Sequence, residues 1–148
     1  VNHICGCDWR TMAAFDDRQL VNEGRISEQF IGQHLIDISE GLEQPSLHYW
    51  LREKKSANAE VDYVIATGGS ILPIEVKAGT SGSLKSLQQF AFSKNTKLAI
   101  RFDLNPTSIQ QVEHTIRTAT GNKQVRFTLL SLPLYGVQEL KRITSNGL

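Results

Sequence analysis

The chain has 148 residues, 40% of them hydrophobic and 21% charged, which suits one globular domain with a hydrophobic core and excludes a disordered or fibrous protein. The formal net charge of +1 excludes a protein that is basic throughout, so any contact with nucleic acid has to come from a local patch. No apolar run is long enough to cross a bilayer and the N-terminus has no signal-peptide pattern, so we expect a cytoplasmic protein without a membrane partner.

The first part of the chain is poorly patterned, and we expect residues 1–22 to be a remnant of an upstream region and residues 23–148 to form a single domain. The chain starts at Val1, and its one methionine, Met12, is internal. This favours a fragment of a longer protein, although a processed chain would look the same.

Both cysteines lie in this first part. Cys5 and Cys7 are too few and too close for a disulfide framework, which favours a reducing compartment. With His3 they form H-x-C-x-C, but this pattern lacks the second ligand pair that makes a zinc site convincing. We therefore expect no metal site here.

A helix is expected over residues 27–39, with Ser27 as its N-cap and Gly41 as its stop. One face of this helix is apolar and consists of Phe30, Ile31, Leu35 and Ile38. Glu28 lies along the edge of that face. As a carboxylate in the first turn, Glu28 also interacts favourably with the helix dipole, and this interaction explains the residue without any functional role.

A strand is expected over residues 47–51 and a hairpin over residues 60–77, where EVDYVIATGGSILPIEVK forms two alternating strands around a Gly-Gly turn. The alternation gives the hairpin an apolar face made of Val61, Tyr63, Ile65, Leu72, Ile74 and Val76. The opposite face carries Asp62, Glu75 and Lys77, so two acids and a lysine converge beside a core.

The remaining elements are expected in the order helix, strand, helix, strand and short helix, over residues 84–93, 97–102, 106–118, 125–132 and 137–142. Asn105 or Thr107 is the expected N-cap of the helix over 106–118, and Pro133 the expected break after the last strand. The crossover after the hairpin implies a parallel strand pair. These expectations describe a mixed α/β domain with a central sheet flanked by helices.

Several known motifs are absent. The loop after residue 77 fails the P-loop pattern, because Gly79 and Gly82 are too close and Lys85 comes three residues after Gly82. No G-x-S-x-G, H-E-x-x-H or paired C-x-x-C occurs. Ser83 is expected to cap the next helix, whose free N–H groups, with Lys85, offer one contact to a backbone phosphate. A glycine-rich loop that merely ends in a capped helix explains the pattern equally well.

The acids and the lysine remain as the candidate site. Carboxylates on adjacent strands, here Asp62 and Glu75, bind a hard cation such as Mg²⁺ or Mn²⁺, which makes a bound water nucleophilic. Lys77 emerges on the same face and is placed to orient that water or to stabilise charge on a phosphate. A solvated charged strand face is the alternative interpretation.

Three segments resemble a known family: GRISEQFIGQHL, YWLREKKSANAEVDYVIATGGSILPIEVKAG and SLKSLQQF. The acid, acid-x-lysine pattern after a helix is similar to the PD-(D/E)XK nuclease superfamily. More narrowly, residues 23–134 resemble the domain of unknown function that follows an AAA+ ATPase module in many bacterial and archaeal proteins. The resemblance implies a restriction-endonuclease-like core of helix, three strands, helix and strand, with the ATPase module upstream in the same full-length chain.

The resemblance also implies roles for individual residues. It assigns metal binding to Asp62 and Glu75, assistance of the nucleophile to Lys77, and support of the metal site to Glu28. It further assigns Gln33 to positioning a phosphate or a metal-bound water, and Ser86 to a polar position near the site. One departure is Glu60, which stands where the superfamily name has a proline, although the ATPase-linked group often has an acidic residue there.

The leading hypothesis is a Mg²⁺-dependent endonuclease-like domain that acts on DNA under the control of the attached ATPase. The alternative is a catalytically inactive docking or DNA-binding module that serves the ATPase, which the near-zero net charge favours. A third hypothesis is a structural domain whose Asp62, Glu75 and Lys77 form a surface ion cluster of little energetic consequence.

Overall fold

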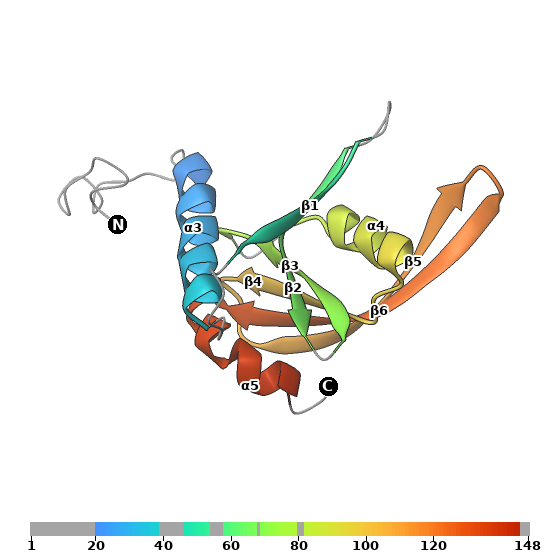
Figure 1. Ribbon diagram of the computed structural model, residues 1–148. Coiled ribbons are helices and arrows are strands. Elements are labelled where there is room, and N and C mark those ends of the chain that lie inside the picture. Colours follow the sequence, from blue (N-terminus) through green and yellow to red (C-terminus); the bar gives the residue numbers. More distant parts are fainter. Residues whose placement is uncertain (1–19, 39–45, 54–57, 68, 80–81, 146–148) are drawn as a thin grey trace.

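The computed structural model describes residues 20–38, 46–53, 58–67, 69–79 and 82–145. They form a mixed six-stranded sheet with helices on both faces (Figure 1). The elements in chain order are α3 (Leu20–Ile38), β1 (His48–Arg52), β2 (Ala59–Thr67), β3 (Ser70–Val76), α4 (Lys85–Lys94), β4 (Leu98–Asp103), β5 (Ser108–Thr118), β6 (Gly121–Pro133), the 3₁₀ helix η2 (Leu134–Glu139) and α5 (Leu140–Ser145). The expected mixed α/β architecture is confirmed at this level.

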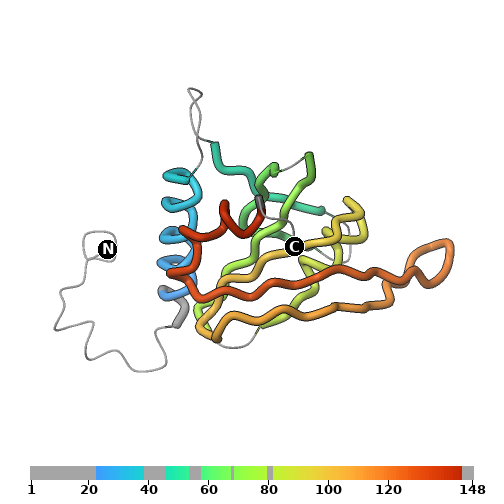
Figure 2. Tube along the Cα trace, turned by 90° about the horizontal axis from the view of Figure 1, so that it is seen from below, coloured from blue at the N-terminus to red at the C-terminus, as the bar shows by residue number. Residues whose placement is uncertain are grey.

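The sheet has the strand order β1-β2-β3-β4-β6-β5. The pairs β1–β2, β2–β3 and β5–β6 are antiparallel, whereas β3–β4 and β4–β6 are parallel. The hairpin over residues 60–77 and the parallel crossover that follows it are therefore present as predicted. Figure 2 shows that the β5–β6 hairpin extends away from α3, beyond the body of the sheet.

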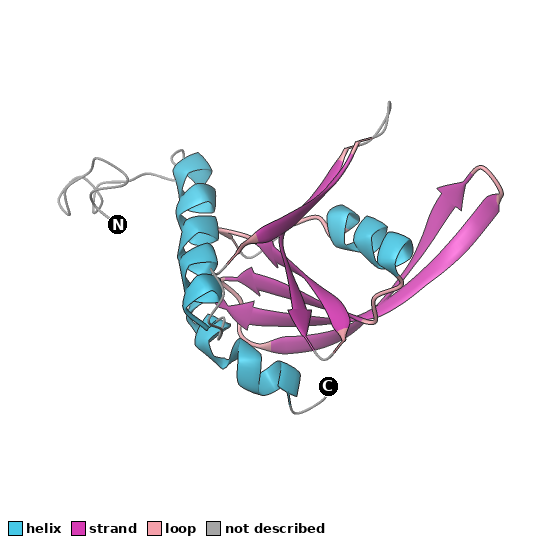
Figure 3. Ribbon diagram, in the orientation of Figure 1, coloured by secondary structure: helices cyan, strands magenta, loops and turns pink. Residues whose placement is uncertain are grey.

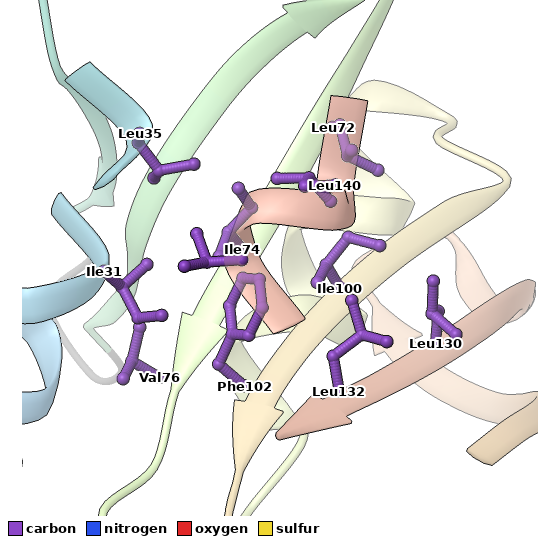
Figure 4. Packing of buried hydrophobic residues seen from close by; sticks show 11 residues of the cluster. Ile31, Leu35, Leu72, Ile74, Val76, Ile100, Phe102, Leu130, Leu132 and Leu140 are labelled. Carbon is purple, nitrogen blue, oxygen red and sulfur yellow. The ribbon is translucent and has the colours of Figure 1, made fainter. Parts of the chain in front are cut away.

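Each face of the sheet has its own apolar cluster. On one face, α3, η2 and α5 cover the cluster that includes Ile74 and Phe102 (Figure 4). On the other face, α4 is the one described helix that covers the cluster that includes Phe90 and Leu129 (Figure 3). Because β3 and β4 are covered on both sides, their charged side chains Glu75, Arg101 and Asp103 are largely removed from water. No described helix is long and apolar enough to cross a membrane.

The first helix begins earlier than predicted. It starts at Leu20 rather than at Ser27, and Ser27 is a buried residue inside it, so Ser27 is not an N-cap. The turns before Ser27 have no clear apolar stripe and contain Gly24, a weak helix former. The sequence pattern therefore did not predict a helix there. The expected stop at Gly41 lies outside the described residues.

The predicted helix over residues 106–118 is wrong, because this segment is the strand β5. Val112 and Ile116 are four residues apart, a spacing that fits one face of a strand as well as one face of a helix. The segment is also rich in β-branched residues, which favour strands. The hairpin closes at Gly121, whose φ of 113° is open to glycine but strained for other residues.

Neither Asn105 nor Thr107 is therefore a helix N-cap. Instead, the backbone N–H of Asn105 donates to Oδ1 of Asp103 at 2.8 Å, which closes a turn at the end of β4. β6 starts at Gly121, four residues before the predicted strand. Pro133 ends it as expected, and η2 and α5 occupy the region of the predicted short helix.

The helix predicted over residues 84–93 is present as α4, whose buried residues are Leu87, Phe90 and Ala91. The predicted cap is wrong. Leu84 occupies the N-cap position without a side-chain hydrogen bond, and Ser83 lies one residue before it. The Ser83 hydroxyl accepts the N–H of Lys85 at 3.2 Å and so forms a local turn before the helix.

Candidate functional site

Glu75 lies near the end of β3, between β2 and β4 in the middle of the sheet. Its neighbours Ile74 and Val76 pack in the cluster under α3, so strand alternation directs Glu75 toward the opposite face. Only 6% of its side chain is exposed, and Oε1 accepts a hydrogen bond from Nζ of Lys77. The predicted acid–lysine pair is thus formed, but as a largely buried pair.

Lys77 follows β3 directly and continues the ladder. Its backbone N–H donates to the carbonyl of Phe102 on β4 at 2.8 Å. Its side chain lies against Gly82, where an added Cβ would come within 2.9 Å of Cδ of Lys77. A glycine at this position lets the loop pack on the lysine stem, which helps to direct Nζ toward Glu75.

Asp62 connects β2 to β3 through its side chain. Its Oδ2 accepts the backbone N–H of Val76 at 2.7 Å. The two strands pair in regular register only from Tyr63 and Ile74 onward, so the carboxylate binds a backbone group beyond the paired region. A carboxylate that accepts a backbone N–H is held in one orientation, which fixes Asp62 close to the end of β3.

A β-bulge produces this placement. The register between β1 and β2 shifts so that Asp62 and Tyr63 together lie opposite Tyr49. As a result, Val61 packs under α4, whereas Tyr63 and Ile65 pack under α3. The prediction that these three residues share one face is wrong, because it assumed strict alternation through the bulge.

Tyr63 docks α3 onto the sheet close to Glu28. Its hydroxyl donates to the backbone carbonyl of Glu28 at 2.8 Å. An added Cβ at Gly32 would lie 2.6 Å from this hydroxyl, so the approach of Tyr63 requires glycine there. The isolated glycine inside the helical pattern was the available sequence signal for this contact, which was not predicted.

The three carboxyl groups interact with one another and with Lys77. Burial first, and then the charge of Asp62, raises the pKa of Glu75 from 4.5 to about 7, against the opposing effect of Lys77. Burial also raises the pKa of Asp62, while the hydrogen bond from Val76 opposes this rise. The pKa of Glu28 is raised by burial and then by Asp62. The site therefore gathers more negative charge than Lys77 neutralises.

One carboxylate oxygen of Glu75 is not used by the hydrogen bond to Lys77. Oε2 is buried and has no hydrogen-bond partner among the described residues, which is unfavourable unless another group supplies one. Carboxylate oxygens suit Mg²⁺, which needs only one or two of them together with water. Asp62 and Glu75 fit that requirement. Within the described ranges, however, no three His, Cys, Asp or Glu side chains are grouped as metal ligands.

The other predicted site residues lie in two places. Lys85 and Ser86 are in the first turn of α4 and line a hollow beside it. Gln33 is exposed on α3, the helix on the other face of the sheet, and is not brought to that hollow. Glu60 is exposed at the start of β2, close enough for its charge to raise the pKa of Asp62.

A polar row that was not predicted from the sequence crosses the sheet. Arg101 on β4 lies in register with Glu75 on one side and with Ser131 of β6 on the other. Nε of Arg101 lies 2.7 Å from Oδ2 of Asp103, and both side chains are largely buried. The charges in the otherwise apolar strand LAIRFD were the available signal. Their alignment with Glu75 is a property of the sheet register.

Comparison with known families gives one result. A family model described as a domain of unknown function, DUF4143, matches residues 23–135. A search of curated proteins finds no match.

Proposed function

The chain belongs to the DUF4143 family, a domain of unknown function, and we propose that it is a Mg²⁺-dependent endonuclease-like domain that hydrolyses DNA phosphodiester bonds. One observation carries this proposal. Glu75 and Lys77 contact each other at the end of β3, and Asp62 is held against the same end of β3 by its hydrogen bond to Val76. Two acids and a lysine thus meet at one site, in which Glu75 is buried and Asp62 and Lys77 are half-buried.

The order of elements supports a relationship with the PD-(D/E)XK superfamily. The run α3, β1, β2, β3, α4, β4 has the order helix, three strands, helix and strand that the resemblance implies. Restriction-endonuclease-like topology in the narrower sense is part of the proposal. We also propose that the chain works with an AAA+ ATPase module of the same full-length protein in the cytoplasm, on the basis of the three similar segments.

In the proposed mechanism, Asp62 and Glu75 hold a Mg²⁺ or Mn²⁺ ion and Glu28 supports them from α3. When bound, this cation supplies polarisation of a phosphate oxygen and a lowered pKa of a coordinated water. The chain's own contribution is orientation and charge. Glu75 keeps the Lys77 ammonium beside the site, where it stabilises negative charge that develops on the phosphate.

Protonation of Glu75 sets the working pH of this site. A pKa near 7 means that the carboxyl is about half protonated at neutral pH, and a protonated carboxyl is a poor cation ligand. Activity is therefore expected to rise with pH through this range. The charge of Asp62 contributes to the raised pKa, so the two acids act as one unit.

A plasmid-nicking assay tests the proposal. Supercoiled DNA is incubated with the parent chain in Mg²⁺ or Mn²⁺, and with the Glu75→Gln and Lys77→Met variants. Both variants are expected to lose at least about a hundredfold in rate, as for loss of a charge-stabilising or acid–base group. Glu113→Gln is the matched control, because Glu113 is an exposed carboxylate on β5 that pairs with Arg126. Equal nicking by all variants excludes the mechanism.

A catalytically inactive DNA-binding or docking module is the second candidate. It is favoured by the lack of a three-residue metal-ligand group among the described residues and by the pairing of Lys77 with Glu75, which leaves the ammonium engaged. The same assay separates the two candidates. Binding of DNA in a chelator together with no nicking by the parent in either cation supports this second function.

A further inference from the structure

A hollow of about 680 Å³ lies between α4, the end of the β1–β2 pair and the tip of the β5–β6 hairpin. Figure 1 shows α4 between these two strand pairs. We call this hollow the cationic groove. The residues of its lining that matter here are Arg52, Lys85, Ser86, Phe92, Arg117 and Lys123.

The charges that line this groove are of one sign. Arg52, Lys85, Arg117 and Lys123 all line it, and no aspartate or glutamate among the described residues does. The chain as a whole carries a net charge of only +1, so this is a local concentration of positive charge. A concave surface lined by one sign of charge attracts ions of the opposite sign.

Among the described residues, these cations have no acidic partner. Lys85, Arg117 and Lys123 form no ion pair with any described residue, in contrast to Arg126, whose Nε lies 3.1 Å from Oε1 of Glu113. Arg52 donates through Nη1 to the neutral side chain of Gln89 on α4, which holds the guanidinium in place without neutralising it. The charge of the groove is therefore available to a ligand.

We propose that the cationic groove binds the phosphate backbone of a single nucleic-acid strand. Phosphates spaced along a strand match several separated cations, and the hydroxyl of Ser86 adds a polar group of the kind that contacts phosphate. Phe92, which keeps 37% of its surface exposed in the groove, offers a ring on which an unpaired base stacks. The choice of nucleic acid among polyanions rests on the proposed function.

Along the chain, the lining of the groove adjoins the segments that carry the acid–lysine site. Ala59 lines the groove and stands three residues before Asp62 on β2. Lys85 lines it and follows the loop whose Gly82 packs against the Lys77 side chain.

Binding of a labelled single-stranded DNA of about 20 nucleotides, measured by fluorescence anisotropy in EDTA, tests the groove. The double variant Lys85→Ala/Lys123→Ala is expected to bind about tenfold more weakly than the parent. With four phosphate contacts the slope of log affinity against log salt is about −3, and it falls to about −1.5 in this variant. Both lysines are exposed, so the fold is expected to survive the change.

The matched control is Lys94→Ala/Lys97→Ala. It removes the same charge, but Lys94 and Lys97 line a separate hollow at the other end of α4. This variant is expected to bind as the parent does. Absence of binding by the parent, unchanged binding by Lys85→Ala/Lys123→Ala, or equal weakening in both double variants overturns the proposal.

The chelator separates this test from the test of hydrolysis. Cation-dependent cleavage is switched off in EDTA, so the binding result does not depend on whether the chain is an enzyme. Groove-dependent binding without nicking in Mg²⁺ keeps the groove and rejects the hydrolase. Nicking without groove-dependent binding rejects the groove alone.

Discussion

Asp62 on β2 accepts the backbone N–H of Val76 on β3 through Oδ2, at 2.7 Å. The bond ties the two strands together beside the point where the bulge against β1 breaks the regular alternation of β2. It also gives Asp62 a structural task besides any role in cation binding. The two tasks make different demands on the side chain, because the hydrogen bond needs an acceptor oxygen whereas cation binding needs a charge.

Substitution at Asp62 separates these tasks. Asp62→Ala leaves the N–H of Val76 without its acceptor and is expected to lower the free energy of unfolding by about 1–3 kcal/mol. Asp62→Asn keeps an acceptor oxygen but removes the ionisable carboxyl. Because burial raises the pKa of that carboxyl, its charged form is unfavourable in the folded chain, and near pH 7 the variant is expected to be at least as stable as the parent. Urea unfolding of the three proteins measures this, and equal stability of Asn and Ala variants contradicts the structural task.

The contact between Tyr63 and Gly32 predicts opposite effects for two glycines of the same helix. Gly32→Ala places a methyl group 2.6 Å from the Tyr63 hydroxyl and is expected to destabilise the chain by about 1–3 kcal/mol. Gly24→Ala meets no atom within 4 Å and is expected to stabilise it by about 0.5–1 kcal/mol through helix propensity. Thermal unfolding compares them, and a stabilising Gly32→Ala contradicts the close approach.

The hairpin that carries the site was predictable because its information is local. Alternation with period two, together with a Gly-Gly turn, identifies both strands and the side of the sheet to which Glu75 belongs. β5 was not predictable in this way. Val112 and Ile116 satisfy the helix and strand periods equally, and pairing with β6 decides between them.

The same distinction holds within the site. The acid–lysine pair follows from spacing along one strand, and the structure brings Lys77 to Glu75 as expected. Arg101 and Ser131 join the row of Glu75 only through the register of strands that are distant in sequence. The bulge at Asp62 likewise exists only against β1, so the alternation of the isolated strand predicted the wrong face for Tyr63.

The raised pKa of Glu75 makes stability depend on pH. Between the unfolded value of 4.5 and the folded value of about 7, the folded chain holds a proton that the unfolded chain has lost. The stability that Glu75 contributes is therefore greatest below pH 4.5 and falls as the pH rises to about 7. From about pH 5 to about pH 8 the parent is expected to lose about 2 kcal/mol more than Glu75→Gln does.

Urea unfolding at the two pH values tests this dependence. Glu113→Gln serves as the control, because it removes a carboxyl that is exposed on the hairpin, and it is expected to follow the parent. If the free energy of unfolding of Glu75→Gln changes between the two pH values as much as that of the parent, Glu75 does not titrate in this range and its pKa is not raised.

The loop glycine beside Lys77 is expected to affect activity more than stability. In Gly82→Ala the added Cβ lies 2.9 Å from Cδ of a flexible side chain, which moves away with a stability change below about 1 kcal/mol. The movement displaces the ammonium from Glu75, so nicking is expected to fall about tenfold or more. Gly79→Ala, with no atom within 4 Å, is the control in the same loop, and equal rates for both variants contradict a role for the position of Lys77.

Cation binding should release protons, because a pKa of about 7 leaves Glu75 about half protonated at neutral pH. Calorimetric titration of Mg²⁺ into the parent at about pH 7, in buffers of different ionisation enthalpy, is expected to show release of about half a proton per ion. At about pH 8.5 the release is expected to fall close to zero, since Glu75 is then already ionised. Glu75→Gln is expected to lose both the binding and the proton release, whereas Glu113→Gln retains both. Saturable binding without proton release at about pH 7 places the cation away from Glu75, and binding that survives in Glu75→Gln removes this residue from the ligand set.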